Sequence, residues 1–211
     1  VDCKDKYAKG FREGDLIPYY FEDILRDVVR RINADLFANL TSEEEKNVFL
    51  EISNALRGDE IKILNCLKYG VEVYLRGKGK VCVKLIDYEK PENNIFFYLV
   101  EAKFRGRPEN IKPDITLFVN GIPIVVVEVK RLVRLYSYRE AIEQIRRYEM
   151  FSLELFTFVQ FGVAVGDEER YTPTLPNWSR ERRDLPAFRW IVKERDENGK
   201  IIRRPDITYI L

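Results

Sequence analysis

Apolar residues recur at helical spacing through the first third of the chain. From 16 to 40 they lie three or four positions apart, which predicts one amphipathic helix. Thr41 and Glu44 have the spacing of a capping box, so a second helix is expected to start there. A third, short helix is expected over 60–69. Residues 1–70 are therefore expected to form an N-terminal helical region.

The period then changes to the alternation that is typical of β-strands. Strands are expected over 71–75, 81–86, 95–100, 114–119, 122–129 and 156–165, with a helix over 137–150 that opens on the capping-box spacing of Ser137 and Glu140. Asn120-Gly121 between two apolar runs predicts a hairpin over 113–130. This order indicates a mixed α/β domain. Residues 71–165 are expected to form its sheet core, and 166–211 an irregular, basic extension of the same domain.

The chain of 211 residues contains no histidine and three cysteines, and has a formal net charge of +1. The lack of histidine excludes Ser–His–Asp and Cys–His nucleophile pairs and imidazole metal ligands. The cysteines form no CxxC pair, which argues against a zinc site or a disulfide framework. The longest aliphatic run, 122–127, is too short to cross a bilayer. We expect a soluble cytoplasmic protein that does not contact a membrane, and catalysis, if any, by carboxylates, lysines, tyrosines or an oxygen-bound metal.

Two carboxylates and a lysine form the candidate site. Glu128 and Lys130 are two residues apart on an expected strand, so both side chains leave the same face. Asp114 opens the partner strand and supplies a second carboxylate. Carboxylates on neighbouring strands suit Mg²⁺, and a lysine beside the ion can orient or help deprotonate an attacking water. The combination predicts phosphodiester hydrolysis without histidine.

The register of the hairpin decides whether these groups meet. A regular two-residue turn pairs Asp114 with Val127 and leaves Glu128 on the opposite face. A three-residue loop or a bulge near Pro123 shifts the pairing by one residue and places Asp114 opposite Glu128, with Cβ atoms about 4.5–5.5 Å apart. We predict the bulged register.

Asp114 with Glu128-Val-Lys130 resembles the PD-(D/E)xK nuclease motif. The surrounding sequence resembles the N-terminal nuclease region of the R subunit of type I restriction enzymes. Three segments carry the resemblance. They are Leu-Ile-Asp-Tyr-Glu-Lys-Pro-Glu-Asn-Asn at 85–94, the segment from Lys112 to Lys130 that contains the motif, and Glu-Ala-Ile-Glu-Gln-Ile-Arg-Arg-Tyr at 140–148. The resemblance implies an α/β, restriction-endonuclease-like fold, with a central mixed β-sheet flanked by helices.

The same resemblance implies a DNA endonuclease that uses Mg²⁺, with Mn²⁺ as an alternative. It implies that Asp114 and Glu128 hold the ion, that the carbonyl of Val129 adds a ligand, and that Lys130 assists the water. A QxxxY motif of this branch is matched by Gln144 and Tyr148, which lie on one face of a helix. Tyr148 is expected to contact DNA, and Gln144 to hold Lys130 or a phosphate.

The implied partners are double-stranded DNA and the methylation and specificity subunits of a restriction complex. A basic rim beside the site would hold the DNA backbone, formed by Lys130, Arg131, Arg134, Arg139, Arg146 and Arg147. Of these, Arg131 and Arg134 are expected to contact the DNA. R subunits of this family continue into an ATP-driven motor, whereas this chain has no GxxxxGK[ST] phosphate loop. ATP would therefore act only through motor domains that this chain lacks.

Several alternatives stay open at this stage. The family's more N-terminal acidic ligand has two candidates, Glu22 and Glu44. Glu101-Ala-Lys103 repeats the ExK pattern, but it precedes any candidate aspartate and is therefore interpreted as the exposed end of an ordinary strand. A repair exonuclease or a junction resolvase of the same superfamily would carry a similar site. A non-catalytic module that binds DNA or docks to a partner would share the fold and would not cleave.

Overall fold

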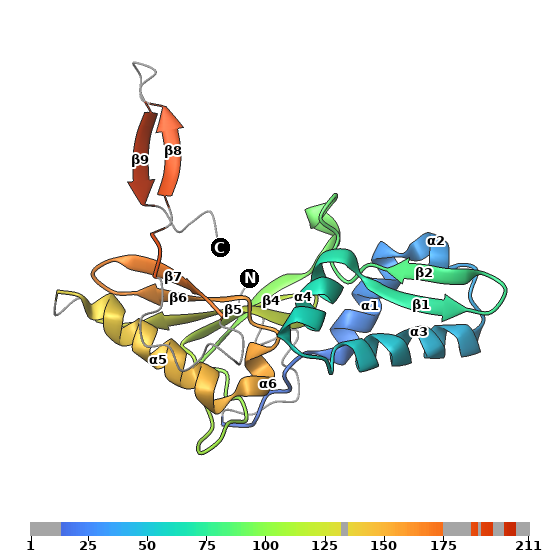
Figure 1. Cartoon of the computed structure of the whole chain (residues 1–211), viewed down its shortest axis with the longest axis horizontal. Coiled ribbons are helices and arrows are strands. Elements are labelled where there is room, and N and C mark those ends of the chain that lie inside the picture. The colour runs from blue at the N-terminus through green and yellow to red at the C-terminus, as the bar shows by residue number, and fades with distance from the viewer. Residues whose placement is uncertain (1–13, 132–134, 175–186, 190, 196–200, 206–211) are drawn as a thin grey trace.

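A five-stranded mixed sheet forms the centre of the fold (Figure 1). The computed structural model describes residues 14–131, 135–174, 187–189, 191–195 and 201–205. The strands of this sheet are, in spatial order, β3 (Phe96–Val100), β4 (Ile115–Val119), β5 (Ile122–Val129), β6 (Phe161–Val165) and β7 (Glu169–Pro173). Only β5 and β6 run parallel, because a helical crossover joins them. The mixed α/β class expected from the sequence is confirmed.

Two helices cover one face of this sheet, as Figure 1 shows: α5 (Ser137–Phe151) and the short α6 (Leu153–Phe156). Ala141 and Ile145 of α5 are buried in one cluster with Val126 of β5. A Cβ atom on Gly162 would lie 2.7 Å from Ile145 Cγ2, so the helix lies close against β6. This contact fixes α5 against β5 and β6. The formation of α6 also shortens the strand expected over 156–165.

The N-terminal part forms a second cluster of helices with a small hairpin. It contains α1 (Glu22–Ile32), α2 (Ala34–Phe37), α3 (Ser42–Ala55), α4 (Glu60–Tyr69), β1 (Val71–Leu75) and β2 (Gly79–Val83). In the described residues β1 and β2 pair only with each other, and their apolar side chains join the core of α1, α3 and α4. Residues 71–83 therefore pack with the helical region and not in the central sheet, which differs from the expected boundary at residue 70.

The helix expected over 16–40 is interrupted twice. Residues before Glu22 are not helical, and Ile17 donates its backbone N–H to the carbonyl of Lys103 at 2.8 Å. Asn33 separates α1 from α2, because its side-chain amide donates to the carbonyls of Val29 and Lys84. The single-helix prediction was wrong here, since apolar spacing does not reveal such side-chain bonds. The capping box of Thr41 and Glu44 is confirmed.

The tail expected to be irregular contains regular strands. β7 completes the central sheet beside β6, and β8 (Ile191–Arg195) pairs with β9 (Ile201–Pro205) in an antiparallel hairpin. A 3-10 turn, η1 (Pro91–Asn93), precedes β3. Within the described segments no helix is both long and apolar enough to span a bilayer.

Candidate nuclease site

The β4–β5 hairpin carries the bulge predicted from the sequence. Asn120 and Gly121 have φ values of 53° and 85°, as a two-residue type I′ turn requires, and Val119 pairs with Ile122. The register then shifts between Leu117 and Phe118, which leaves Ile124 as the extra residue, and Ile115 pairs with Val127. The next pair along the ladder is Asp114 with Glu128. The bulged register is thus confirmed.

Asp114 ends the pairing of β4 with β5 through its side chain. Its Oδ2 accepts the backbone N–H of Val129 at 2.7 Å, in place of the next backbone bond. Because the N–H and C=O of a strand residue face the same neighbour, the carbonyl of Val129 also lies on the Asp114 side. The carboxylate is thereby fixed beside the end of β5.

Glu128 is a buried carboxylate with one satisfied oxygen. Its residue is 2% exposed, and burial raises the pKa of its carboxyl group. Lys130 Nζ donates to Oε1 at 2.9 Å, whereas Oε2 accepts no hydrogen bond from any residue that the structure describes. A buried oxygen without a partner costs about 1–3 kcal/mol. Such a position is typical of a group kept for a ligand and not for stability.

The QxxxY pair on α5 positions Lys130. Gln144 Oε1 accepts from Lys130 Nζ at 2.5 Å, and Gln144 Nε2 donates to the hydroxyl of Tyr148 at 2.5 Å. The hydroxyl of Tyr148 donates to the carbonyl of Lys112 at 3.1 Å. Burial raises the pKa of Tyr148 to about 12, so this hydroxyl stays a neutral donor. The chain of bonds therefore joins α5, the end of β5 and the segment before Asp114.

Tyr148 is 6% exposed. In this geometry its hydroxyl orients Gln144 and the Lys112 segment, and its contact with DNA stays a prediction. Gln144 holds Lys130, which is one of the two roles predicted for it from the sequence.

The start of α5 is fixed by a residue that the sequence pattern did not identify. Tyr136 precedes the helix at φ 66°, and no side-chain cap comes from the expected Ser137–Glu140 box. The carboxylate of Asp167 instead accepts the backbone N–H groups of Tyr136 and Tyr138, at 2.6 and 3.3 Å. Asp167 lies in the turn after β6, thirty residues from the helix start, so only the tertiary structure could reveal this cap. The capping-box prediction at Ser137 was wrong.

The basic residues of the predicted rim do not all face solvent. Arg131 is exposed directly after β5, and Arg134 lies outside the described residues. Arg146 is 14% exposed and forms an ion pair with the buried Glu149 at 2.6 Å. Its role is therefore to join α5 to β7, where it also bonds to Thr172. The sequence could not separate Arg146 from the exposed Arg147, because both lie in the same run.

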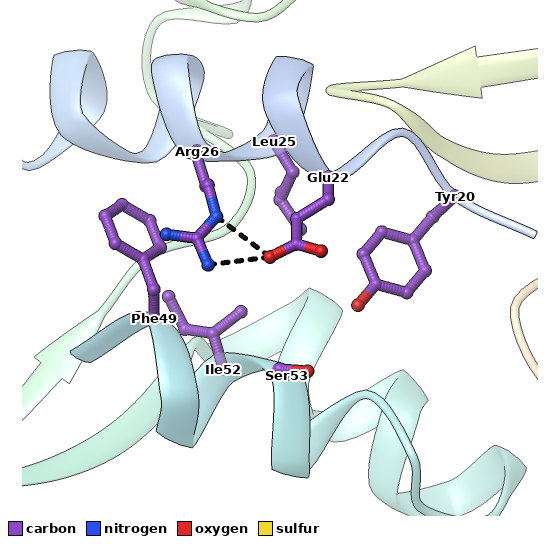
Figure 2. A pocket seen from close by; sticks show the side chains of 7 residues that line it. All are labelled: Tyr20, Glu22, Leu25, Arg26, Phe49, Ile52 and Ser53. Atoms are coloured by element: carbon purple, nitrogen blue, oxygen red, sulfur yellow. Dashed lines mark hydrogen bonds and ion pairs between the residues drawn. The ribbon is translucent and has the colours of Figure 1, made fainter. Parts of the chain in front are cut away.

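The two candidates for a further acidic ligand lie away from Asp114. Phe21 donates its N–H to the carbonyl of Gly121, which places the start of α1 at the turn end of β5. Six strand residues, 122–127, lie between this turn and Glu128, which is about 20 Å at the usual rise. Figure 2 shows Glu22 in a small pocket, paired with Arg26 at 2.6 Å. Glu44 is held in its capping box and by Lys78.

Glu101 lies next to the site, although its ExK pattern was set aside in the sequence. Its backbone N–H donates to the carbonyl of Asp114 at 2.9 Å, so it sits opposite Asp114 at the end of β3. Its carboxylate pairs with Lys112 at 3.3 Å, and both side chains are about half exposed. Only the β3–β4 register reveals this proximity, which sequence order conceals.

The donor set fits a hard divalent cation. In the described part of the chain no group of three or more Asp, Glu or Cys side chains could hold a metal by itself. The protein would supply the carboxylates of Asp114 and Glu128 and the carbonyl of Val129. Mg²⁺ is commonly held by one or two carboxylates, with water and substrate phosphates in the other positions. The unbonded Oε2 of the buried Glu128 agrees with such a ligand set.

Relatives of the chain carry names from one class of enzyme. A Methanocaldococcus jannaschii protein named as the type I restriction enzyme MjaVIIP endonuclease subunit is 51% identical over 148 residues, 70% of this chain and 14% of the relative. The MjaVIIIP endonuclease subunit of the same organism is 38% identical over 92% of this chain and 19% of the relative. The type I restriction enzyme HindI endonuclease subunit of Haemophilus influenzae is 30% identical over 77% and 17%.

The chain thus spans less than a fifth of the length of these relatives. The family described as the N terminus of the type I restriction enzyme R protein matches residues 5–181, which includes every described residue of the candidate site. The chain therefore belongs to this family of R-protein N-terminal regions.

Proposed function

We propose that this chain is a metal-dependent DNA endonuclease domain that hydrolyses phosphodiester bonds in double-stranded DNA. The observation that carries the proposal is the buried Glu128 opposite Asp114, with one oxygen on Lys130 and the other unbonded. The names of the relatives support the same class of reaction. In a longer R subunit the domain would act with methylation and specificity subunits, and ATP would act through the motor part.

The residues of the site divide the work between binding and proton handling. Asp114, Glu128 and the carbonyl of Val129 would hold Mg²⁺ or Mn²⁺, and such an ion supplies charge stabilisation and a lower pKa for bound water. Lys130 lies beside Glu128 and donates from a fixed position, so it orients a water or stabilises a phosphate oxygen. Gln144 keeps the Lys130 ammonium in place. Arg131 and Arg134 would hold the DNA backbone.

Cleavage of supercoiled plasmid tests this assignment. With Mn²⁺ or Mg²⁺ the chain is expected to convert supercoiled DNA to nicked circles. Asp114→Asn and Lys130→Met should each lower the rate by at least about 100-fold, since each removes a group that acts on the transition state. Asp35→Asn on α2 and Lys46→Met on α3 are matched controls, since both helices belong to the N-terminal part, which meets β5 at its turn end and not at Glu128; they should keep the rate.

Retention of metal-dependent nicking by Asp114→Asn would refute the site. Calorimetric titration with Mn²⁺ gives a second measurement, which does not depend on cleavage. One ion should bind the wild-type chain, and the Asp114→Asn variant should not bind it. A chain that binds duplex DNA and Mn²⁺ but never nicks would favour the non-catalytic module. Linear, circular and branched substrates separate an endonuclease from an exonuclease or a resolvase.

A further inference from the structure

The connection between β3 and β4 forms a basic loop beside the candidate site. We define the basic loop as residues 103–112; its charged side chains are Lys103, Arg105, Arg107 and Lys112, with Glu109 as its one carboxylate. The loop leaves the sheet after Glu101 and returns at Asp114, which are hydrogen-bonded neighbours. Its two ends therefore lie next to the carboxylate that opens the site.

The basic loop is held rigidly against two other parts of the chain. Phe104 and Ile111 exchange backbone hydrogen bonds at 2.9 and 3.0 Å and are buried in the core. In the N-terminal segment, the backbone N–H of Ile17 donates to the Lys103 carbonyl. At the end of α5, Ser152 Oγ donates to the Arg105 carbonyl at 2.6 Å, and the Phe151 carbonyl accepts the Arg107 N–H at 2.7 Å. A Cβ atom on Gly106 would lie 2.3 Å from the Glu109 carbonyl oxygen. The tip of the loop is thus closed tightly on the end of α5.

These anchors place two arginines at the end of α5, about two helical turns from Gln144, which holds Lys130. Tyr148 donates to the carbonyl of Lys112, and Phe151 lies three residues further along the same helix, about 4.5 Å of axial rise. The backbone of Arg107 bonds to Phe151, so it lies roughly one helical turn from Tyr148. Arg105 and Arg107 are exposed, and neither forms an ion pair within the described residues. Lys112, by contrast, is paired with Glu101.

We propose that Arg105 and Arg107 hold the sugar–phosphate backbone of duplex DNA on the β3–β4 side of the site. This rests on the proposed function and adds a contact surface that the basic rim after β5 does not include. A guanidinium group matches the geometry of a phosphate, and one strand of B-DNA presents a phosphate about every 3.4 Å of helix axis. The pair therefore contacts phosphates near the one that is cleaved and fixes the position of the strand without reading its sequence.

The salt dependence of DNA binding tests the surface. A labelled duplex of about 30 base pairs, several times the reach of one site, is titrated with the chain in EDTA by fluorescence anisotropy at a series of NaCl concentrations. Arg105→Gln/Arg107→Gln should lower the slope of log K against log salt by about 1.8, because each lost phosphate contact removes about 0.9. The affinity at 0.1 M NaCl should fall by at least about tenfold, and equally for duplexes of different sequence.

Arg57→Gln/Arg76→Gln is the matched control, since it removes the same charge from two exposed arginines of the N-terminal helices and the β1–β2 turn. It should keep the slope and lie within about twofold of the wild type in affinity, as rim charges away from an interface act weakly. An unchanged slope in the Arg105/Arg107 variant, or an equal loss in the control, overturns the proposal. Unchanged thermal melts exclude misfolding as the cause of any loss.

Plasmid nicking separates this inference from the proposed function. The Arg105/Arg107 variant should raise the DNA concentration at half-maximal rate and leave the saturated rate within about threefold. If the wild type binds DNA through the pair but never nicks, the contact surface stands and the nuclease assignment fails. If the wild type nicks and the variant changes neither slope nor half-saturation, the surface fails alone. A wild type that binds no duplex overturns both.

Discussion

Glu128 is placed for function at a cost in stability, and the substitution Glu128→Gln exposes that cost. Glutamine has the same shape, keeps an oxygen for Lys130 and removes the charge. The carboxylate is 2% exposed, its Oε2 has no hydrogen-bond partner in the described part of the chain, and burial raises the pKa of the group. The ionised form is therefore destabilised in the folded state relative to water.

The magnitude follows from two opposing effects. Glutamine removes the desolvation cost of the buried carboxylate, which is on the order of several kcal/mol per ion, and it also removes the attraction to Lys130. The Lys130 ammonium is not left as an uncompensated buried charge, because its side chain is partly exposed and keeps the Gln144 oxygen as a partner. An amide N–H left at the position of Oε2 lacks a partner in the described structure, which costs roughly 1 kcal/mol. We expect a net gain of about 1–2 kcal/mol in the free energy of unfolding without metal. For a chain of this size that corresponds to a rise of roughly 2–8 °C in Tm.

Thermal melts with and without Mn²⁺ measure this prediction. In EDTA the Gln variant should melt above the wild type. A metal at 100 times its Kd stabilises the folded wild type by about 2.7 kcal/mol, so saturating Mn²⁺ should reverse the order and leave the variant unchanged. Glu101→Gln, on the half-exposed neighbouring carboxylate, is the control and should stay within about 0.5 kcal/mol. A variant that melts below the wild type in EDTA would refute the argument that Glu128 is kept at the expense of stability.

Three further changes have defined outcomes. Gln144→Ala removes an acceptor of the Lys130 ammonium. Steady-state kinetics should show a saturated nicking rate that is about 10- to 100-fold lower, with unchanged DNA affinity. An unchanged rate would contradict the positioning role of Gln144. Asn120→Ala removes the three side-chain hydrogen bonds of the buried Asn120, with the Ile95 N–H, the Leu85 carbonyl and Asn94, and leaves alanine at positive φ. Urea unfolding should show a loss of about 3–4 kcal/mol, and a loss under 1 kcal/mol would contradict the network. The amide of Asn93 and then the Lys90 N–H lower the pKa of Asp87. Its ionised form therefore stabilises the fold above the ordinary pKa of an aspartate, and this contribution is lost as pH falls through the lowered folded pKa. Asp87→Asn should therefore be less stable than the wild type at neutral pH and converge with it in acid, as pH-dependent unfolding would show; a constant difference down to low pH would contradict this.

Local sequence signals predicted the elements whose causes are local. The Thr41–Glu44 box, the short helix over 60–69 and the Asn120–Gly121 turn each depend on residues within a few positions of one another. Contacts between distant segments were not predictable in this way. Three contacts show this. Asp167 caps α5 from thirty residues away, and Glu101 lies beside Asp114. Arg146 bonds to β7, although in the sequence it is one of two adjacent arginines that cannot be told apart.

The sequence by itself determined which groups are present: two carboxylates, a lysine and the Gln144–Tyr148 pair, in a chain without histidine. It left two registers for the hairpin, because Val125, Val126 and Val127 are equally apolar on both faces and a shift by one residue exchanges those faces. The tertiary structure decided between them. With Ile124 in the bulge, Glu128 and Lys130 emerge under α5, where Gln144 gives the lysine a partner and Asp114 lies opposite. In the other register the charges of Glu128 and Lys130 would leave the face away from α5 and lose these partners.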